Sequence, residues 1–179
     1  MKAFYLKLID QLTKSAEVKA SFIDKKLDPI KAVDLYKGQY LNPKIFEMYP
    51  QPCVFMDWTI LYDSDNSKNP SKVQIGIHLS IEQLRDTSSL SKQLSKSLLL
   101  FDYIDETHKA VKKITTPITG KLRLVDEGVV DEASSLSIYK ITYQAEYSGR
   151  KEDAMEDYDC TDGEGEIEMQ GELIDHFEL

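Results

Sequence analysis

The sequence predicts an α+β protein: a four-stranded, mainly antiparallel sheet made of two hairpins, with helices packed on one face. Two kinds of pattern support this class. Apolar residues recur at helical spacing near the N-terminus and again between residues 90 and 114, whereas other segments are apolar runs or alternate apolar and polar residues as strands do. A chain of 179 residues can bury one core without disulfides or a metal. The expected order is helix, long hairpin, helix and second hairpin.

The first expected helix covers residues 2–20. Apolar residues follow one another there at intervals of four: Phe4, Leu8 and Leu12. The helical region ends before Pro29, because the residue that precedes a proline avoids helical backbone angles. Residues 29–52 hold four of the six prolines, and we interpret them as a connector with one short helix over residues 29–36.

The long hairpin gives the clearest strand pattern. Its first arm, residues 53–62, is almost continuously apolar and fits a strand that is covered on both faces. Its second arm, residues 73–82, alternates strictly and predicts a strand whose buried face consists of Val73, Ile75, Ile77, Leu79 and Ile81. Each arm has about ten residues, nearly twice the usual strand length. Strands of that length often project beyond their own domain.

The second helix and the second hairpin complete the body. Helical spacing extends over residues 90–114, and strands are expected over residues 122–130 and 136–147. Gly128 suggests a bulge in the first of these strands, at residues 126–128. Three tyrosines share one face of the last strand: Tyr139, Tyr143 and Tyr147. Core packing and a contact between subunits both remain open as their role.

Charge divides the chain into two parts. Residues 151–179 carry one basic and twelve acidic residues, a net charge of −11, so residues 1–150 are close to neutral at +2. We therefore predict a domain over residues 1–150 and an acidic extension over residues 151–179 that is disordered or docks. Docking is kept open because Ile167 and Met169 alternate with acids. The net charge of the whole chain, −9, argues against direct nucleic-acid binding. No apolar run is long enough to predict a membrane segment.

No arrangement of residues in the sequence matches a known catalytic or metal-binding motif. The best hints of an enzyme are Asp57, Asp102 and His108, which have no motif spacing. The three histidines lack metal-ligand spacing, and the acidic stretch 157–168 has its glycine one position late for a calcium loop. Two cysteines are too few for a disulfide framework or a cysteine zinc site, which favours an intracellular protein. We therefore expect no catalytic residue, no cofactor and no metal.

Self-association is the function that the strand pattern favours. A strand that is apolar on both faces, in a domain with only two helices, leaves surface for a second subunit to cover. The candidate interface residues are Phe55, Asp57, Trp58, Tyr139, Tyr143 and Tyr147.

The order of elements resembles the tail terminator and head–tail joining proteins of long-tailed bacteriophages and related prophages. The resemblance covers about residues 1–148: the N-terminal helix, the proline-rich approach to Pro52-Cys53-Val54-Phe55, the long hairpin, the second helix and the closing strands. It implies a non-enzymatic protein that forms a ring, usually a hexamer, at the tail end or head–tail junction. Its partners would be other tail or connector proteins, in the virion or the host cytoplasm.

The chain departs from that family pattern in two places, the long connector of residues 24–51 and the acidic extension. An alternative hypothesis is a small cytosolic binding or adaptor module whose acidic extension engages a basic partner. An enzyme of unknown type is a third and weaker alternative.

Overall fold

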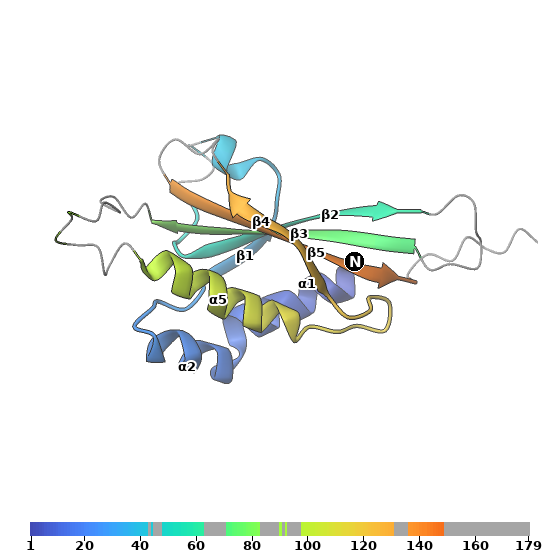
Figure 1. Cartoon of the computed structure of the whole chain (residues 1–179), viewed down its shortest axis with the longest axis horizontal. Helices are drawn as coiled ribbons and strands as arrows, with labels where there is room; N and C mark the ends of the chain where they lie inside the picture. Colours follow the sequence, from blue (N-terminus) through green and yellow to red (C-terminus); the bar gives the residue numbers. More distant parts are fainter. Residues whose placement is uncertain are drawn as a thin grey trace, which may run out of the picture.

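A computed structural model describes residues 1–42, 44, 48–62, 71–82, 90, 92, 98–130 and 136–148, and the structural statements below concern these residues. They form two layers, in which helices pack on one face of a five-stranded sheet (Figure 1). The predicted α+β class is confirmed. The acidic extension, residues 151–179, lies outside the described residues.

The sheet is mixed, in the order β1-β2-β3-β5-β4. Its strands are β1 (Ala32–Leu35), β2 (Cys53–Leu61), β3 (Ser71–Glu82), β4 (Arg123–Val129) and β5 (Leu136–Tyr147). Neighbours are antiparallel except β1, which runs parallel to β2. The two predicted hairpins are therefore present, and β3 joins them by pairing with β5.

The prediction of four strands missed β1. We expected a short helix over residues 29–36, but the backbone there is extended along the first half of β2. Lys31 N donates to Pro52 O at 2.9 Å, and Tyr36 N donates to Met56 O at 2.8 Å. Pairing with a strand 21 residues further along the chain decides the conformation of this segment, and local propensity does not.

The helical layer begins with α1 (Lys2–Ile9), continues through one π-helical turn (Asp10–Lys14) and resumes as α2 (Ala16–Asp24). The single helix predicted over residues 2–20 is therefore interrupted at Ser15, whose side chain caps α2 by accepting from Val18 N at 3.4 Å. Helix α5 (Leu99–Lys112) is the C-terminal part of the helix predicted over residues 90–114. The earlier part of that prediction lies almost wholly outside the described residues.

The main core lies between the helices and the sheet. The helical residues Phe4, Leu8 and Leu12 are fully buried, as their spacing predicted. Ile75, Ile77 and Leu79 are fully buried in the same cluster, so the alternating arm of the hairpin does face the helices.

Strand β2 follows the prediction over only part of its length. Cys53–Met56 are buried on both faces, whereas the following residues, Asp57–Leu61, are half-buried or exposed. On the face away from the helices, a second small core of Tyr40, Cys53, Phe55 and Ile138 is covered by the connector. The chain's own connector thus covers much of the apolar surface that we had assigned to another subunit.

Strand β4 contains the predicted irregularity at a slightly different place. Its register against β5 shifts between Leu124 and Asp126, so the extra residue is Val125 rather than one of residues 126–128. The bulge precedes Gly128.

Candidate functional site

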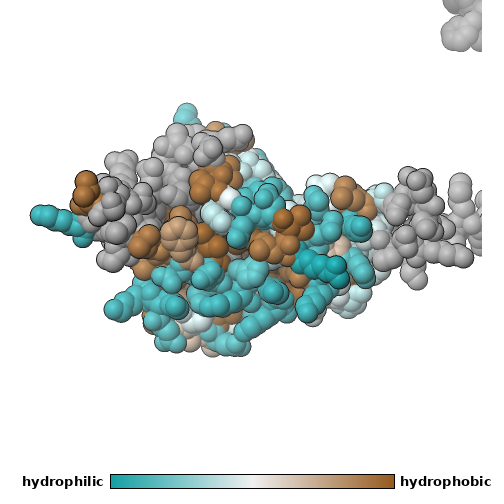
Figure 2. Space-filling view, viewed as in Figure 1, coloured by the Kyte–Doolittle hydropathy of each residue, from teal (hydrophilic) through white to brown (hydrophobic). Residues whose placement is uncertain are grey.

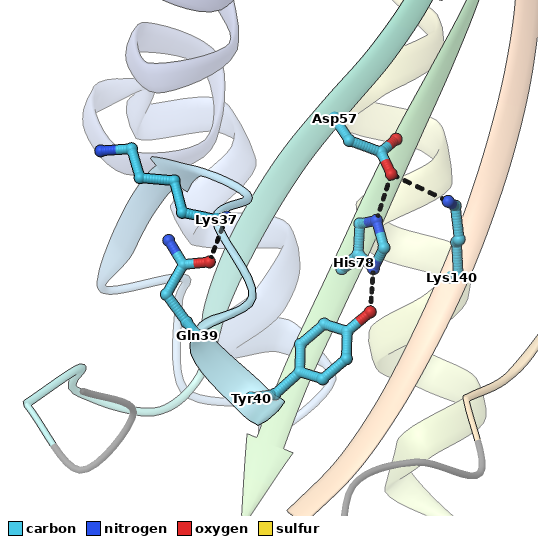
Figure 3. Close-up of polar contacts among 6 residues, drawn as sticks. All are labelled: Lys37, Gln39, Tyr40, Asp57, His78 and Lys140. Carbon is cyan, nitrogen blue, oxygen red and sulfur yellow. Dashed lines mark hydrogen bonds and ion pairs between the residues drawn. The ribbon is translucent and has the colours of Figure 1, made fainter. Parts of the chain in front are cut away.

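Four polar side chains meet on the sheet face that is turned away from the helices, and we call them the open-face cluster. Asp57 comes from β2, His78 from β3 and Lys140 from β5, while Tyr40 reaches them from a 3-10 turn (Gln39–Leu41) in the connector (Figure 3). His78 Nε2 lies 3.0 Å from Asp57 Oδ2, and His78 Nδ1 lies 3.1 Å from the Tyr40 hydroxyl oxygen. Lys140 Nζ donates to the same Asp57 oxygen at 2.9 Å.

The strand registers bring these residues together. Asp57 pairs with Gly76, and His78 pairs with Lys140, so strand alternation places all three side chains on one face. Gly76 makes room for them, because a Cβ atom at this position would overlap Asp57 Oδ1 and approach Lys140 Cε to 2.7 Å. A side chain on residue 76 would therefore displace the carboxylate from its partners.

Asp57 is ionised at neutral pH. Burial by itself would raise its pKa, but the hydrogen bonds from His78 and Lys140 outweigh burial and lower the pKa to about 2. A carboxylate can only accept, so His78 Nε2 carries the hydrogen of that bond; in the neutral ring, Nδ1 then accepts the proton of the Tyr40 hydroxyl. The cluster is a satisfied chain of donors and acceptors.

Aromatic rings cover the His78 imidazole, while the Asp57 and Lys140 side chains stay 34% and 36% exposed. The Tyr36 ring stacks on the His78 imidazole with ring centres 4.6 Å apart, and Tyr40 stacks on Tyr36 at 4.8 Å. His78 is only 2% exposed as a result. Nearby, burial raises the pKa of the Cys53 thiol to about 12, which leaves it protonated and unreactive. The arrangement anchors the connector to the sheet through the Tyr40 hydroxyl.

A second polar network holds the start of the connector. The Tyr49 hydroxyl donates to Asp34 Oδ2 at 2.5 Å, and Leu35 N donates to Asp34 Oδ1 at 2.7 Å. Gln39 Nε2 donates to Leu35 O at 2.6 Å, and Gln39 Oε1 accepts from Lys37 N at 2.6 Å. Burial would raise the pKa of Asp34, but the hydrogen bonds from Tyr49 and from Leu35 N outweigh burial and lower the pKa.

The three residues that hinted at an enzyme are not brought together. Asp57 lies on the open face, whereas Asp102 and His108 belong to α5 on the other side of the sheet. Asp102 pairs with Lys25 at 3.7 Å, and His108 Nδ1 lies 2.9 Å from the hydroxyl oxygen of the buried Tyr143. The part of the chain that the structure describes contains no group of three His, Cys, Asp or Glu side chains arranged to hold a metal.

The six candidate interface residues fall into two sets. Phe55, Tyr143 and Tyr147 are buried in the chain's own cores, so they are not available to another subunit in this structure. Asp57 and Tyr139 are half-buried, and Trp58 is 40% exposed. Sequence periodicity favoured a core role for the tyrosines and left an interface open as the next interpretation. Position relative to the helices separates the two roles.

One unpaired part of the sheet is the outer edge of β2 from Asp57 to Leu61, which we call the free edge. Strand β1 pairs with Cys53–Met56 only, and no described residue pairs with β2 on that side beyond Met56. Strands β2, β3 and β5 extend beyond the helices at this end of the molecule (Figure 1). Along the free edge, Trp58 and Leu61 are 40% and 44% exposed.

The remaining apolar surface in view is dispersed. Figure 2 shows apolar side chains in several patches separated by hydrophilic surface. None of the helices that the structure describes is long and apolar enough to cross a membrane. No protein-family model matches the chain, and no curated protein matches its sequence.

Proposed function

We propose that this chain is a structural protein that assembles with further copies of itself. Its place would be a ring at the tail end or head–tail junction of a phage, where it contacts other tail or connector proteins. The free edge of β2 carries this proposal. The ring, the partners and the location in virion or host cytoplasm come from the resemblance of the element order, and the structure supports the self-association.

An unpaired strand edge is a template for another strand, and monomeric proteins usually protect such edges with charges, prolines or bulges. Strand β4, at the opposite edge of the sheet, is protected in this way. It contains a bulge, and its charged residues Arg123, Asp126 and Glu127 are all exposed. An added strand would meet an irregular edge and exposed charges there.

The free edge of β2 has no comparable protection. Its five residues, Asp-Trp-Thr-Ile-Leu, include no proline and one charge. That charge is Asp57, whose carboxylate turns to the open face and is held by His78 and Lys140. Nothing in this short stretch opposes the approach of a further strand.

A contact between two different surfaces of identical chains also suits a ring. Such a head-to-tail interface closes into a ring when the rotation between copies divides a full turn. The open-face cluster takes no catalytic part in this proposal. It fixes the connector over the sheet.

The test is the mass of the protein in solution over a wide concentration range, by light scattering and analytical ultracentrifugation. We expect a mass above 20.5 kDa that grows with concentration, and rings in electron micrographs. Trp58→Lys places a charge on the free edge and should return the protein to a monomer. The matched control is Leu124→Lys on β4, where the wild-type residue is 44% exposed, and it should leave assembly unchanged. A wild-type protein that stays monomeric at every concentration contradicts the proposal.

A further inference from the structure

The free edge of β2 has a counterpart in the acidic extension. It comprises five residues, Asp57–Leu61. The extension contains one five-residue alternating segment, Glu166-Ile167-Glu168-Met169-Gln170, with Gly165 before it and Gly171 after it. An alternating run bounded by glycines is the sequence pattern of a short strand.

We propose that this segment, residues 166–170, adds as a strand to the free edge of β2 in a neighbouring copy of the chain. The choice of a neighbouring copy rests on the self-association proposed above, because the chain is long enough to reach its own edge as well. Hydrogen bonds between the backbone groups of the two strands would hold the added strand in place. The side chains decide which of its faces is turned to the helices.

The side chains on the two faces of the free edge match those of the segment. Trp58 and Ile60 pair with Ile75 and Val73, whose side chains are in the main core, so they lie on the helix side of the sheet. Trp58 is 40% exposed there. A strand that turns Ile167 and Met169 to this side would remove that apolar surface from water.

The acids of the segment would then lie on the open face. Asp57, Thr59 and Leu61 are on that face. The Asp57 carboxylate there is already bound by Lys140 at 2.9 Å, and Leu61 pairs with Lys72, which is exposed. Glu166 and Glu168 would sit beside Thr59 and near the Lys72 ammonium group. With the opposite orientation, both glutamates would lie against Trp58 and Ile60, which costs desolvation of two carboxylates.

The extension leaves the body at the correct end of the sheet. Tyr147, near the end of β5, pairs with Ser71, and the neighbouring β3 residue Lys72 pairs with Leu61 at the end of the free edge. Seventeen residues lie between Ser148 and Glu166, a length that spans up to roughly 60 Å when extended. That reach includes the free edge of an adjacent subunit.

The experiment is disulfide cross-linking between two full-length variants of different mass. One carries Thr59→Cys and the other carries Glu168→Cys, both with Cys160→Ser; the native Cys53 is buried and its thiol has a raised pKa, so it stays unreactive. After mixing and mild oxidation, we expect a disulfide-linked dimer with one chain of each kind.

Ile167→Cys in place of Glu168→Cys should give about tenfold less product, because successive side chains of a strand point to opposite faces. The control for the other sheet edge replaces Thr59→Cys by Val125→Cys on β4. With Glu168→Cys as its partner, this variant should give no such dimer.

The outcomes separate this inference from the proposed function. Oligomers that form without the Thr59–Glu168 cross-link overturn the inference and leave self-association standing. A cross-link within a monomeric chain that carries both cysteines, but not between chains, shows that each chain covers its own edge, which also overturns the inference. A wild-type protein that is monomeric at all concentrations overturns both.

Discussion

The two halves of β2 belong to one largely apolar run but have different surroundings. Cys53–Met56 are buried on both faces and paired on both edges, by β1 and by β3. Asp57–Leu61 are paired on one edge only among the described residues, and Trp58 and Leu61 are exposed. An apolar run therefore does not identify a core strand by itself. Where the neighbouring strand β1 ends, the apolar residues Trp58 and Leu61 of the same run are exposed.

The largest expected effect comes from truncating one aromatic residue in each half. Phe55→Ala should lower the free energy of unfolding by about 3–5 kcal/mol, because the Phe55 side chain is fully buried and its removal leaves a cavity. Trp58→Ala should cost less than about 1 kcal/mol in the monomer, since Trp58 is 40% exposed. Urea denaturation at low protein concentration measures both values. Similar losses for the two variants would mean that the halves of β2 do not differ as described.

A smaller effect is expected where the two halves meet, at the glycine beside Asp57. Gly76→Ala should cost about 1–3 kcal/mol, because the added methyl group overlaps the Asp57 carboxylate and crowds Lys140. The matched control is Gly128→Ala in β4, where a Cβ atom meets nothing within 4 Å. Thermal melts of the two variants provide the comparison. A Gly76→Ala protein as stable as Gly128→Ala would show that the open-face cluster shifts freely.

The smallest effect concerns the charge of Asp57. Its folded-state pKa of about 2 lies below its unfolded value, so ionised Asp57 stabilises the fold above about pH 4, and this contribution is lost as the pH falls toward 2. The Asp57 side chain is 34% exposed, so we expect only about 1 kcal/mol after solvent screening. Asp57→Asn should therefore flatten the dependence of stability on pH between 4 and 2.

Unfolding free energies measured by urea at several pH values test this expectation. Glu17→Gln serves as the comparison, because Glu17 has a single lysine partner, Lys113, at the surface. An unchanged pH profile for Asp57→Asn would mean that His78 and Lys140 do not hold the carboxylate ionised.

The sequence was sufficient for elements whose pattern is local. Phe4, Leu8 and Leu12 repeat at helical spacing, and Ile75, Ile77 and Leu79 alternate; both patterns arise because one face of each element is buried. Strand β1 could not be predicted in this way. It has four residues, none of them fully buried, and exists because the edge of β2 lies beside it.

The open-face cluster could not be predicted from the sequence for a related reason. Asp57, His78 and Lys140 lie on three strands, and their meeting depends on the sheet order and on two registers that are not local properties. Gly76 is the one local signal, because a glycine in a strand often marks the close approach of another group. The division of the six interface candidates likewise depends on where the helices and the connector lie.

The turn at Gly38 ends the pairing of β1 with β2. Its left-handed backbone, with φ of +81°, turns the chain away from β2 immediately after Tyr36 donates to Met56. The same turn carries Tyr40 across the sheet to His78. The turn at Gly38 therefore has two results: Tyr40 covers His78 on the open face, and the edge of β2 beyond Met56 is left without a partner strand among the described residues. If β1 continued two residues further, the chain would pair with more of the β2 edge, but Tyr40 would no longer reach His78. A change in this connector would therefore alter both the cover over His78 and the edge to which we assign the proposed assembly.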